Sequence, residues 1–242
     1  MQGKRLRGAY ETVKGLEDFG CFSVISALKD CPKAKFDETL EVVLSLNLRV
    51  GKVEHNVRGF VSLPHGTGKT VRVLAFVQDD QVAEATDAGA SLVGGEALVD
   101  AIAKGSQGLD FDRCVAAPAM MPFLGKIGKI LGPRGLMPNP KTGTVSAKIG
   151  EAVRSLMGGQ VSFASDKAGC VRVGLGKLSF SADQLVENFR AFFDAIHGFK
   201  PQGLKSVFIK GAWMSSTMGP GVPLSLEGLA KFSEFSRSEK EG

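Results

Sequence analysis

The chain has little of what an enzyme site or a membrane protein requires. It contains only three histidines and four cysteines, and neither set has metal-ligand spacing, so we expect no metal site. Cys21, Cys31, Cys114 and Cys170 lie too far apart for a zinc ribbon or a CxxC motif, which favours structural thiols in a reducing cytoplasm over a disulfide framework. No apolar run approaches the roughly 20 residues that span a bilayer, and the N-terminus lacks the apolar segment of a signal peptide. We therefore expect a cytoplasmic protein without a membrane partner.

The sequence also lacks acidic residues over a long internal stretch. No carboxylate occurs between Asp112 and Glu151, while the same stretch contains six basic residues: Arg113, Lys126, Lys129, Arg134, Lys141 and Lys148. Within it, residues 125–145 (GKIGKILGPRGLMPNPKTGTV) combine five glycines, three prolines and four basic residues. This composition predicts a stiff, basic surface loop without regular structure over most of its length. With a net charge of +5, the pattern indicates an anionic partner.

Hydrophobic patterning predicts different architectures for the middle and the ends of the chain. In the middle, strands at 71–77, 91–94 and 113–120 alternate with helices at 79–89 and 95–105, which predicts a small parallel, Rossmann-like sheet. Elsewhere we expect helices at 23–31, 144–157 and 181–199, strands at 40–50, 59–63 and 206–217, and a β-hairpin formed by 161–165 and 170–176.

Two glycine-rich breaks divide these regions. The first contains Pro64, Gly66 and Gly68, and the second is Gly158-Gly159; both are expected to act as hinges. The predicted fold class is therefore α/β with two domains. A split, two-layer α+β outer domain comprises 1–66 and 160–227, an inserted α/β domain comprises 67–159, and 228–242 form a flexible tail.

Two other classes of function were weighed against nucleic-acid binding. HGTGKT (65–70) suggests a phosphate-binding P-loop, but Leu63 stands where the first glycine is needed, and the segment precedes a strand instead of following one. Ser215, Ser216 and Thr217 have no sequence-linked histidine or carboxylate to activate them. A nucleotide-dependent enzyme is thus disfavoured, whereas a protein-interaction scaffold built on the parallel sheet stays open at this point.

Two short segments favour RNA. KFDETLEV (35–42) joins an exposed aromatic, Phe36, to alternating polar side chains, and SSTMGPG (215–221) adds short hydroxyls and glycines that permit close backbone approach. Together they suit a sugar–phosphate backbone with 2′-hydroxyl groups.

These segments occur in order with NVRGFVSLPHGTGKTVRV (56–73) and GKILGPRGLMPNPKTGTV (128–145). Over residues 10 to 224 the chain resembles the bacterial type of ribosomal protein L-one, the large-subunit protein of a mobile stalk. The resemblance implies binding to large-subunit ribosomal RNA, assistance to deacylated tRNA leaving the exit site, and repression of translation from its own operon messenger. It also implies a protein that is monomeric off the ribosome and has no catalytic activity, cofactor or small-molecule substrate.

The resemblance also assigns site residues. It implies an RNA surface on the outer domain at Lys35, Phe36, Thr39, Glu41, Ser215, Thr217, Met218, Gly219 and Pro220. We further expect 218–220 to form an inward-facing turn that lets the RNA and protein backbones approach closely. It implies a secondary loop facing RNA and tRNA at Lys126, Lys129, Arg134 and Lys141. Gly211-Ala212-Trp213 departs from the pattern, because smaller or hydroxylated residues are expected there.

Overall fold

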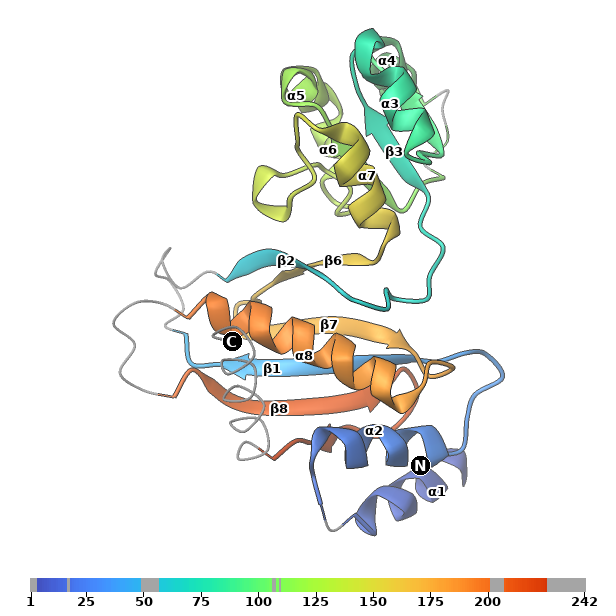
Figure 1. Ribbon diagram of the computed structural model, residues 1–242, viewed down its shortest axis with the longest axis vertical. Helices are drawn as coiled ribbons and strands as arrows, with labels where there is room; N and C mark the ends of the chain where they lie inside the picture. Colours follow the sequence, from blue (N-terminus) through green and yellow to red (C-terminus); the bar gives the residue numbers. More distant parts are fainter. Residues whose placement is uncertain are drawn as a thin grey trace, which may run out of the picture. The chain divides into compact units, whose positions relative to one another are not determined.

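The computed structural model describes residues 4–16, 18–48, 57–105, 108, 110–200 and 207–225 (Figure 1). Two compact units divide the chain after Gly68 and before Phe163; the middle segment, Lys69–Ser162, is unit 2 and the flanking segments are unit 1. The predicted tail at 228–242 lies outside the described residues. Across the part of the chain that is described, no helix combines the length and the apolar character needed to cross a bilayer.

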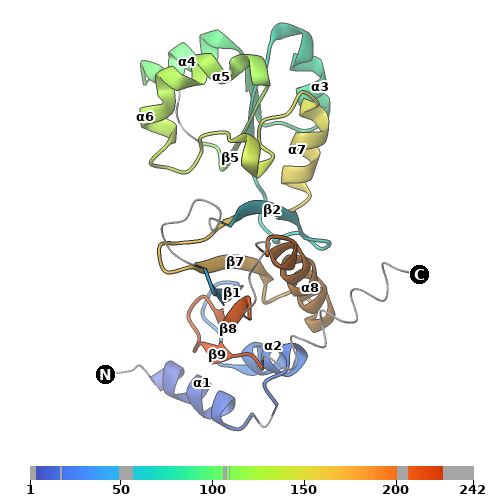
Figure 2. The same cartoon turned by 90° about the vertical axis from the view of Figure 1, so that its left-hand side faces the viewer.

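Unit 1 is built on an antiparallel sheet with helices on one side (Figure 2). In sheet order its strands are β7 (Cys170–Lys177), β1 (Thr39–Leu46), β8 (Ile209–Ser216) and β9 (Val222–Pro223). Helices α2 (Cys21–Asp30) and α8 (Ala182–Gly198) contact each other and the sheet, and α1 (Lys4–Lys14) packs on α2. Every second residue of β1, from Leu40 to Leu46, is buried. Among the described residues of unit 1, no helix lies on the opposite face of the sheet, which we call the uncovered face.

Helix α8 closely follows its predicted span. Ser181 and Gln184 form a capping box in which each side chain accepts a hydrogen bond from the other's backbone N–H. The apolar residues recur at helical spacing and are all buried: Leu185, Phe189, Phe192, Phe193 and Ile196. This stripe forms much of the core between the helices and the sheet.

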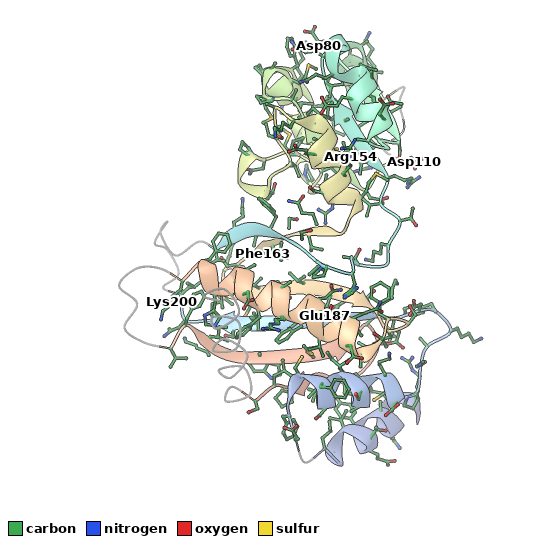
Figure 3. The ribbon with its side chains drawn as sticks, in the orientation of Figure 1. Asp80, Asp110, Arg154, Phe163, Glu187 and Lys200 are labelled. Atoms are coloured by element: carbon green, nitrogen blue, oxygen red, sulfur yellow. The ribbon has the colours of Figure 1, made fainter. Side chains whose placement is uncertain are left out.

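The predicted hairpin between 161–165 and 170–176 is wrong. β6 (Gln160–Ala164) pairs with β2 (Arg58–Ser62) in a two-stranded sheet, while β7 pairs with β1. A tight turn does follow β6, but only a single bridge, Ser165 to Val171, joins the two segments. The strands separate because Phe163 packs edge-on against Phe192 and Phe199, at the C-terminal end of α8 (Figure 3).

Unit 2 contains the predicted parallel sheet, in the order β4 (Leu92–Gly94), β3 (Val73–Phe76) and β5 (Arg113–Ala116). All four residues of β3 are buried, as expected of a central parallel strand. The helical segments that follow these strands are η2 (Asp79–Gln81), α3 (Val82–Asp87), α4 (Glu96–Ala103), η3 (Pro118–Met120) and α5 (Met121–Leu124). The final helix, α7 (Ile149–Met157), begins five residues later than predicted.

The glycine- and proline-rich segment 125–145 is more regular than predicted. It contains η4 (Gly125–Ile127), α6 (Gly128–Leu131) and η5 (Pro140–Thr142). Ile127 and Leu131 are spaced four residues apart and are fully buried in the unit 2 core. Burial of these two side chains stabilises short helical turns despite the glycines, so the prediction of a loop is wrong for 125–131.

Candidate nucleic-acid interface

The start of β1 and the end of β8 lie side by side on the uncovered face of the unit 1 sheet. Glu41 is directly opposite Ser215 on β8 and Gly174 on β7. Two residues before Glu41 on β1, the Thr39 carbonyl accepts a hydrogen bond from the Thr217 N–H. Two segments more than 170 residues apart in sequence thus form one polar surface on which Glu41 is exposed, and the Thr39 methyl group lies against Gly174, 3.2 Å from where a Cβ atom would be.

Thr217 extends the pairing of β1 and β8 with its side chain. Its hydroxyl oxygen accepts a hydrogen bond from the Thr39 N–H at 2.9 Å and lies 3.2 Å from the Thr39 carbonyl, to which it donates. The Thr217 N–H donates to the same carbonyl at 3.0 Å. The hydroxyl is therefore occupied within the protein, and Thr217 shapes the surface more than it offers a donor to a ligand.

A buried carboxylate holds the turn after β8. Glu38 is 3% exposed; one of its oxygens accepts hydrogen bonds from the Ser216 hydroxyl at 2.6 Å and the Met218 N–H at 3.1 Å. The other oxygen accepts from the Ala34 N–H at 2.8 Å and from Arg5 at 3.3 Å. Burial alone would raise the pKa of the Glu38 carboxyl, but these hydrogen bonds and the Arg5 charge together hold that pKa below its ordinary value.

Gly219 is required by this arrangement. A Cβ atom at Gly219 would lie 2.4 Å from the Ser216 hydroxyl oxygen, which donates to Glu38. Any side chain at 219 would therefore displace the network. Met218 is 53% exposed, so the expectation of an inward-facing 218–220 turn is wrong for Met218, while Pro220 is buried. The Met218 backbone N–H thus binds the buried Glu38, while the Met218 side chain is exposed.

The segment before β1 contributes Lys35, which is exposed, and Phe36, which is 54% exposed. Asp37 anchors this segment, because its carboxylate accepts a hydrogen bond from Ser179 and its carbonyl accepts one from Lys177, both at 2.8 Å. The Phe36 ring is thus presented by a segment that is held on both sides of it. Before the ring, the Ala34 N–H donates to the Glu38 carboxylate, and after the ring Asp37 is held by Ser179 and Lys177.

Arg5, Glu38 and Ser216 are the site residues that sequence reasoning missed. Glu38 lies inside the segment that carried the prediction, but its position in the alternation marks it only as an inward-facing residue. An acidic side chain at an inward position, three residues after Lys35, was the available indication. Its partner Ser216 lies within SSTMGPG, whose hydroxyls favour an RNA surface and do not indicate a buried contact with a carboxylate.

The predicted secondary loop lies in unit 2, and a backbone hydrogen bond closes the turn within it. Gly135 has a φ of 68°, the left-handed conformation that favours glycine, and the Leu136 N–H donates to the Leu131 carbonyl at 3.0 Å. Lys129 and Arg134 are exposed on it. Lys126 lies 3.9 Å from the Asp100 carboxylate and over the Phe123 ring, whereas the Lys141 side chain is outside the described part.

A comparison with protein families matches residues 27–220 to the model of the ribosomal protein L1p/L10e family. That span is most of the chain, and it includes both segments of the unit 1 surface and the basic segment of unit 2. The chain belongs to this family. It is accordingly a ribosomal RNA-binding protein of the large subunit, and its family is one of structural RNA-binding proteins, not of enzymes.

In this L1p/L10e family protein, the segment 65–70 does not have the form of a P-loop. Gly66 and Gly68 have positive φ, and the chain continues into strand β3 instead of a helix. Buried Asn188 of α8 accepts a hydrogen bond from the His65 N–H at 3.0 Å and donates to the Gly66 carbonyl at 2.9 Å. His65 also pairs with Glu187, whose place on α8 is labelled in Figure 3. These contacts fix residues 65–66 to unit 1.

The cysteines of the family member are free thiols. Burial raises the pKa of both Cys21 and Cys114 to about 12, so neither forms a reactive thiolate at neutral pH. Among the described residues, no group of three or more histidine, cysteine or acidic side chains is placed to hold a metal ion.

Proposed function

We propose that the uncovered face of the unit 1 sheet is the primary RNA-binding surface, and that it binds a structured element of ribosomal RNA at the mobile stalk. The observation that carries the proposal is the junction of β1 and β8, where the Glu38 network fixes the turn 217–220 beside Glu41 and Phe36. A site built in this way is rigid before RNA binds, so little conformational entropy is lost on binding.

The chemistry of the surface suits ribose more than phosphate. The exposed Glu41 carboxylate can only accept hydrogen bonds, so it selects donors such as a 2′-hydroxyl or a base amino group and repels phosphate. The exposed Met218 supplies a flexible apolar contact to the RNA. Lys35 and the net positive charge supply the long-range attraction.

Unit 2 contributes a second, more electrostatic contact in this proposal. Lys126, Lys129, Arg134 and Lys141 would meet RNA phosphates, including those of deacylated tRNA leaving the exit site. The proposed hinge lies after Gly66, because Asn188 ties residues 65–66 to unit 1, and it uses Gly68 with Gly158 and Gly159 on the return segment. The same unit 1 surface would bind a similar element in the protein's own messenger and repress its translation.

The unit 1 assignment is tested by replacing an exposed methionine. Met218→Ala removes a side chain that is 53% exposed, and we expect RNA affinity to fall by about 1–3 kcal/mol with no loss of stability. Met157→Ala is the matched control, since Met157 is 48% exposed on α7 of unit 2. Filter binding to large-subunit ribosomal RNA fragments measures both. Equal affinities for wild type and Met218→Ala would exclude this turn from the interface.

The division of labour is tested by salt dependence. Changing Lys129 and Arg134 to Gln should reduce the slope of log affinity against log salt by about one to two, without altering which RNA fragment is selected. If the double variant lost its fragment preference, the basic segment would carry recognition, contrary to the proposal. Exit-site tRNA release and synthesis from an operon leader, each measured with and without the wild-type protein, test the two remaining roles.

A further inference from the structure

The indole of Trp213 stands on the uncovered face of the unit 1 sheet, beyond the junction of Glu41 and Ser215 on which the proposal above rests. It is the only tryptophan in the chain and is 43% exposed, while its neighbours Ala212 and Met214 are buried on the opposite face. Leaving so large an apolar ring in water forgoes roughly 25 cal/mol for each Å² that could be buried. The ring is therefore expected to be covered in a complex.

Gly211 creates the space that this ring occupies. A Cβ atom at 211 would lie 2.5 Å from Cη2 and 3.0 Å from Cζ3 of Trp213, so no other residue at 211 is compatible with the ring position. The φ of Gly211 is not positive, which makes the requirement one of space and not of backbone conformation. The ring edge thus lies over the strand at Gly211.

Trp213 continues the proposed RNA surface along the strands. Its direct neighbours across the sheet are Val43 on β1 and Pro223 on β9. The backbone of the Glu41–Ser215 pair is two residues from that of Trp213, or about 7 Å at roughly 3.4 Å per residue, on the side away from Gly211, over which the ring leans. A ligand that covers Glu41 and continues along the strands past Ser215 therefore reaches the indole without leaving the sheet.

The surroundings favour a nucleobase over a protein partner. Val43, Trp213 and Pro223 form a single apolar row, too narrow for the extended apolar core of a stable protein interface. Two exposed cations border it: Arg172, opposite Val43 and 3.1 Å from Asp166, and Lys210, the extra residue of the bulge beside Gly211. One flat ring between basic residues is the arrangement that single-stranded nucleic acid binds.

We infer that Trp213 is a stacking platform for one unpaired base of the RNA that occupies the Glu41 surface. The inference rests on the proposed function, which it extends from ribose contacts to the stacking of a base. The indole supplies a face for any base, and Arg172 and Lys210 supply positive charge for the adjoining phosphates.

The test uses the shortest large-subunit ribosomal RNA fragment that wild type binds in a filter assay. Because Trp213 is the only tryptophan, selective excitation reports this site alone, and we expect quenching with the same midpoint as filter binding. Trp213→Ser should weaken binding roughly 5- to 150-fold, the effect of losing one stacked base. Trp213→Phe should retain most of the affinity. Phe60→Ser, which removes an aromatic that is 46% exposed on β2, is the control and should bind as wild type does.

Abasic substitution of the fragment, one unpaired nucleotide at a time, should identify a single position that abolishes quenching. Full affinity of Trp213→Ser together with unchanged emission on binding would overturn the inference while leaving the proposed function intact. Absence of RNA binding by wild type would instead remove the proposed function. An emission shift that depends on protein concentration alone would assign the ring to self-association and also overturn the inference.

Discussion

Replacing Glu38 with Gln should destabilise unit 1 and disorder its RNA-binding turn. The carboxylate accepts four hydrogen bonds, two at each oxygen, and each oxygen receives one of them from a backbone N–H. The Gln amide group has only one acceptor oxygen. Its NH₂ group must face the N–H of either Ala34 or Met218, whichever way the side chain is turned.

The magnitude follows from the contacts that Glu38→Gln removes. A buried donor left without its acceptor costs about 1–3 kcal/mol, and Arg5 loses its charged partner as well, although it is partly exposed. The Ser216 hydroxyl can rotate and accept a hydrogen bond instead, which offsets part of the loss. We therefore expect the free energy of unfolding of unit 1 to fall by roughly 2–4 kcal/mol.

The pH dependence has a definite sign. Because the pKa of Glu38 is lowered in the folded state, its carboxylate contributes fully above its unfolded value of about 4.5. That contribution is lost as the pH falls through the folded-state pKa. The stability difference between wild type and Glu38→Gln should thus be largest near neutral pH and shrink steadily below pH 4.5.

Urea unfolding followed by the emission of Trp213 measures this difference in unit 1 alone, since the only tryptophan lies in β8. Glu41→Gln is the matched control, because Glu41 is exposed three residues away; we expect its stability to change by less than about 0.5 kcal/mol. RNA affinity should fall for both variants. Glu38→Gln would act by disordering the turn at 217–220, and Glu41→Gln would act by removing a direct contact with the RNA. A Glu38→Gln variant as stable as wild type, or a difference that grows on acidification, would refute the reasoning.

Three further changes test the supports of the site. Gly219→Ala should cost about 1–3 kcal/mol, because its Cβ would meet the Ser216 hydroxyl at 2.4 Å; an unchanged urea midpoint would show that the turn moves freely. Asn188→Leu should lower the free energy of unfolding by roughly 2–4 kcal/mol, because one backbone N–H and two backbone carbonyls lose their hydrogen-bond partner. Faster amide hydrogen exchange at residues 65–66 would show that the effect is local to this segment. Ser181→Ala should cost about 0.5–2 kcal/mol in thermal unfolding through loss of the capping box, and a smaller cost would mean that packing alone holds α8.

Patterns that depend on local spacing predicted the fold well. Helix α8 and the parallel strands of unit 2 follow directly from apolar periodicity and capping, which need no knowledge of distant partners. The pairing of β6 was predicted wrongly because Asp166 to Gly169 do form a turn of the hairpin kind, with the Asp166 carboxylate accepting from two backbone N–H groups. Which strand β6 joins is decided by Phe163 and α8, at long range.

The site could be predicted only in its exposed part. Phe36 and Met218 are exposed, and they belong to segments whose composition already indicated RNA. The geometry that fixes those segments comes from Glu38 and Ser216, which meet across 178 residues of sequence. The periodicity of apolar residues in the sequence does not predict a contact between residues so far apart. The same limit explains why the Thr217 hydroxyl was expected to face RNA, whereas its hydrogen bonds join it to Thr39.

The buried polar side chains indicate which parts of this protein need a fixed geometry for function. Among the described residues, the buried polar or charged side chains are Glu38, Asn188 and Ser216. Well-packed apolar residues in place of such groups and their partners are often neutral or stabilising, so stability alone does not account for them. Two of the three hold the turn at 217–220, and the third holds residues 65–66 before the boundary between the units. Glu38 and Asn188 each bind backbone groups of an irregular segment that no strand or helix would otherwise fix, and Ser216 donates to the Glu38 carboxylate. Their placement therefore indicates that a set geometry of the RNA turn, and of the chain leaving unit 1, is what these side chains maintain.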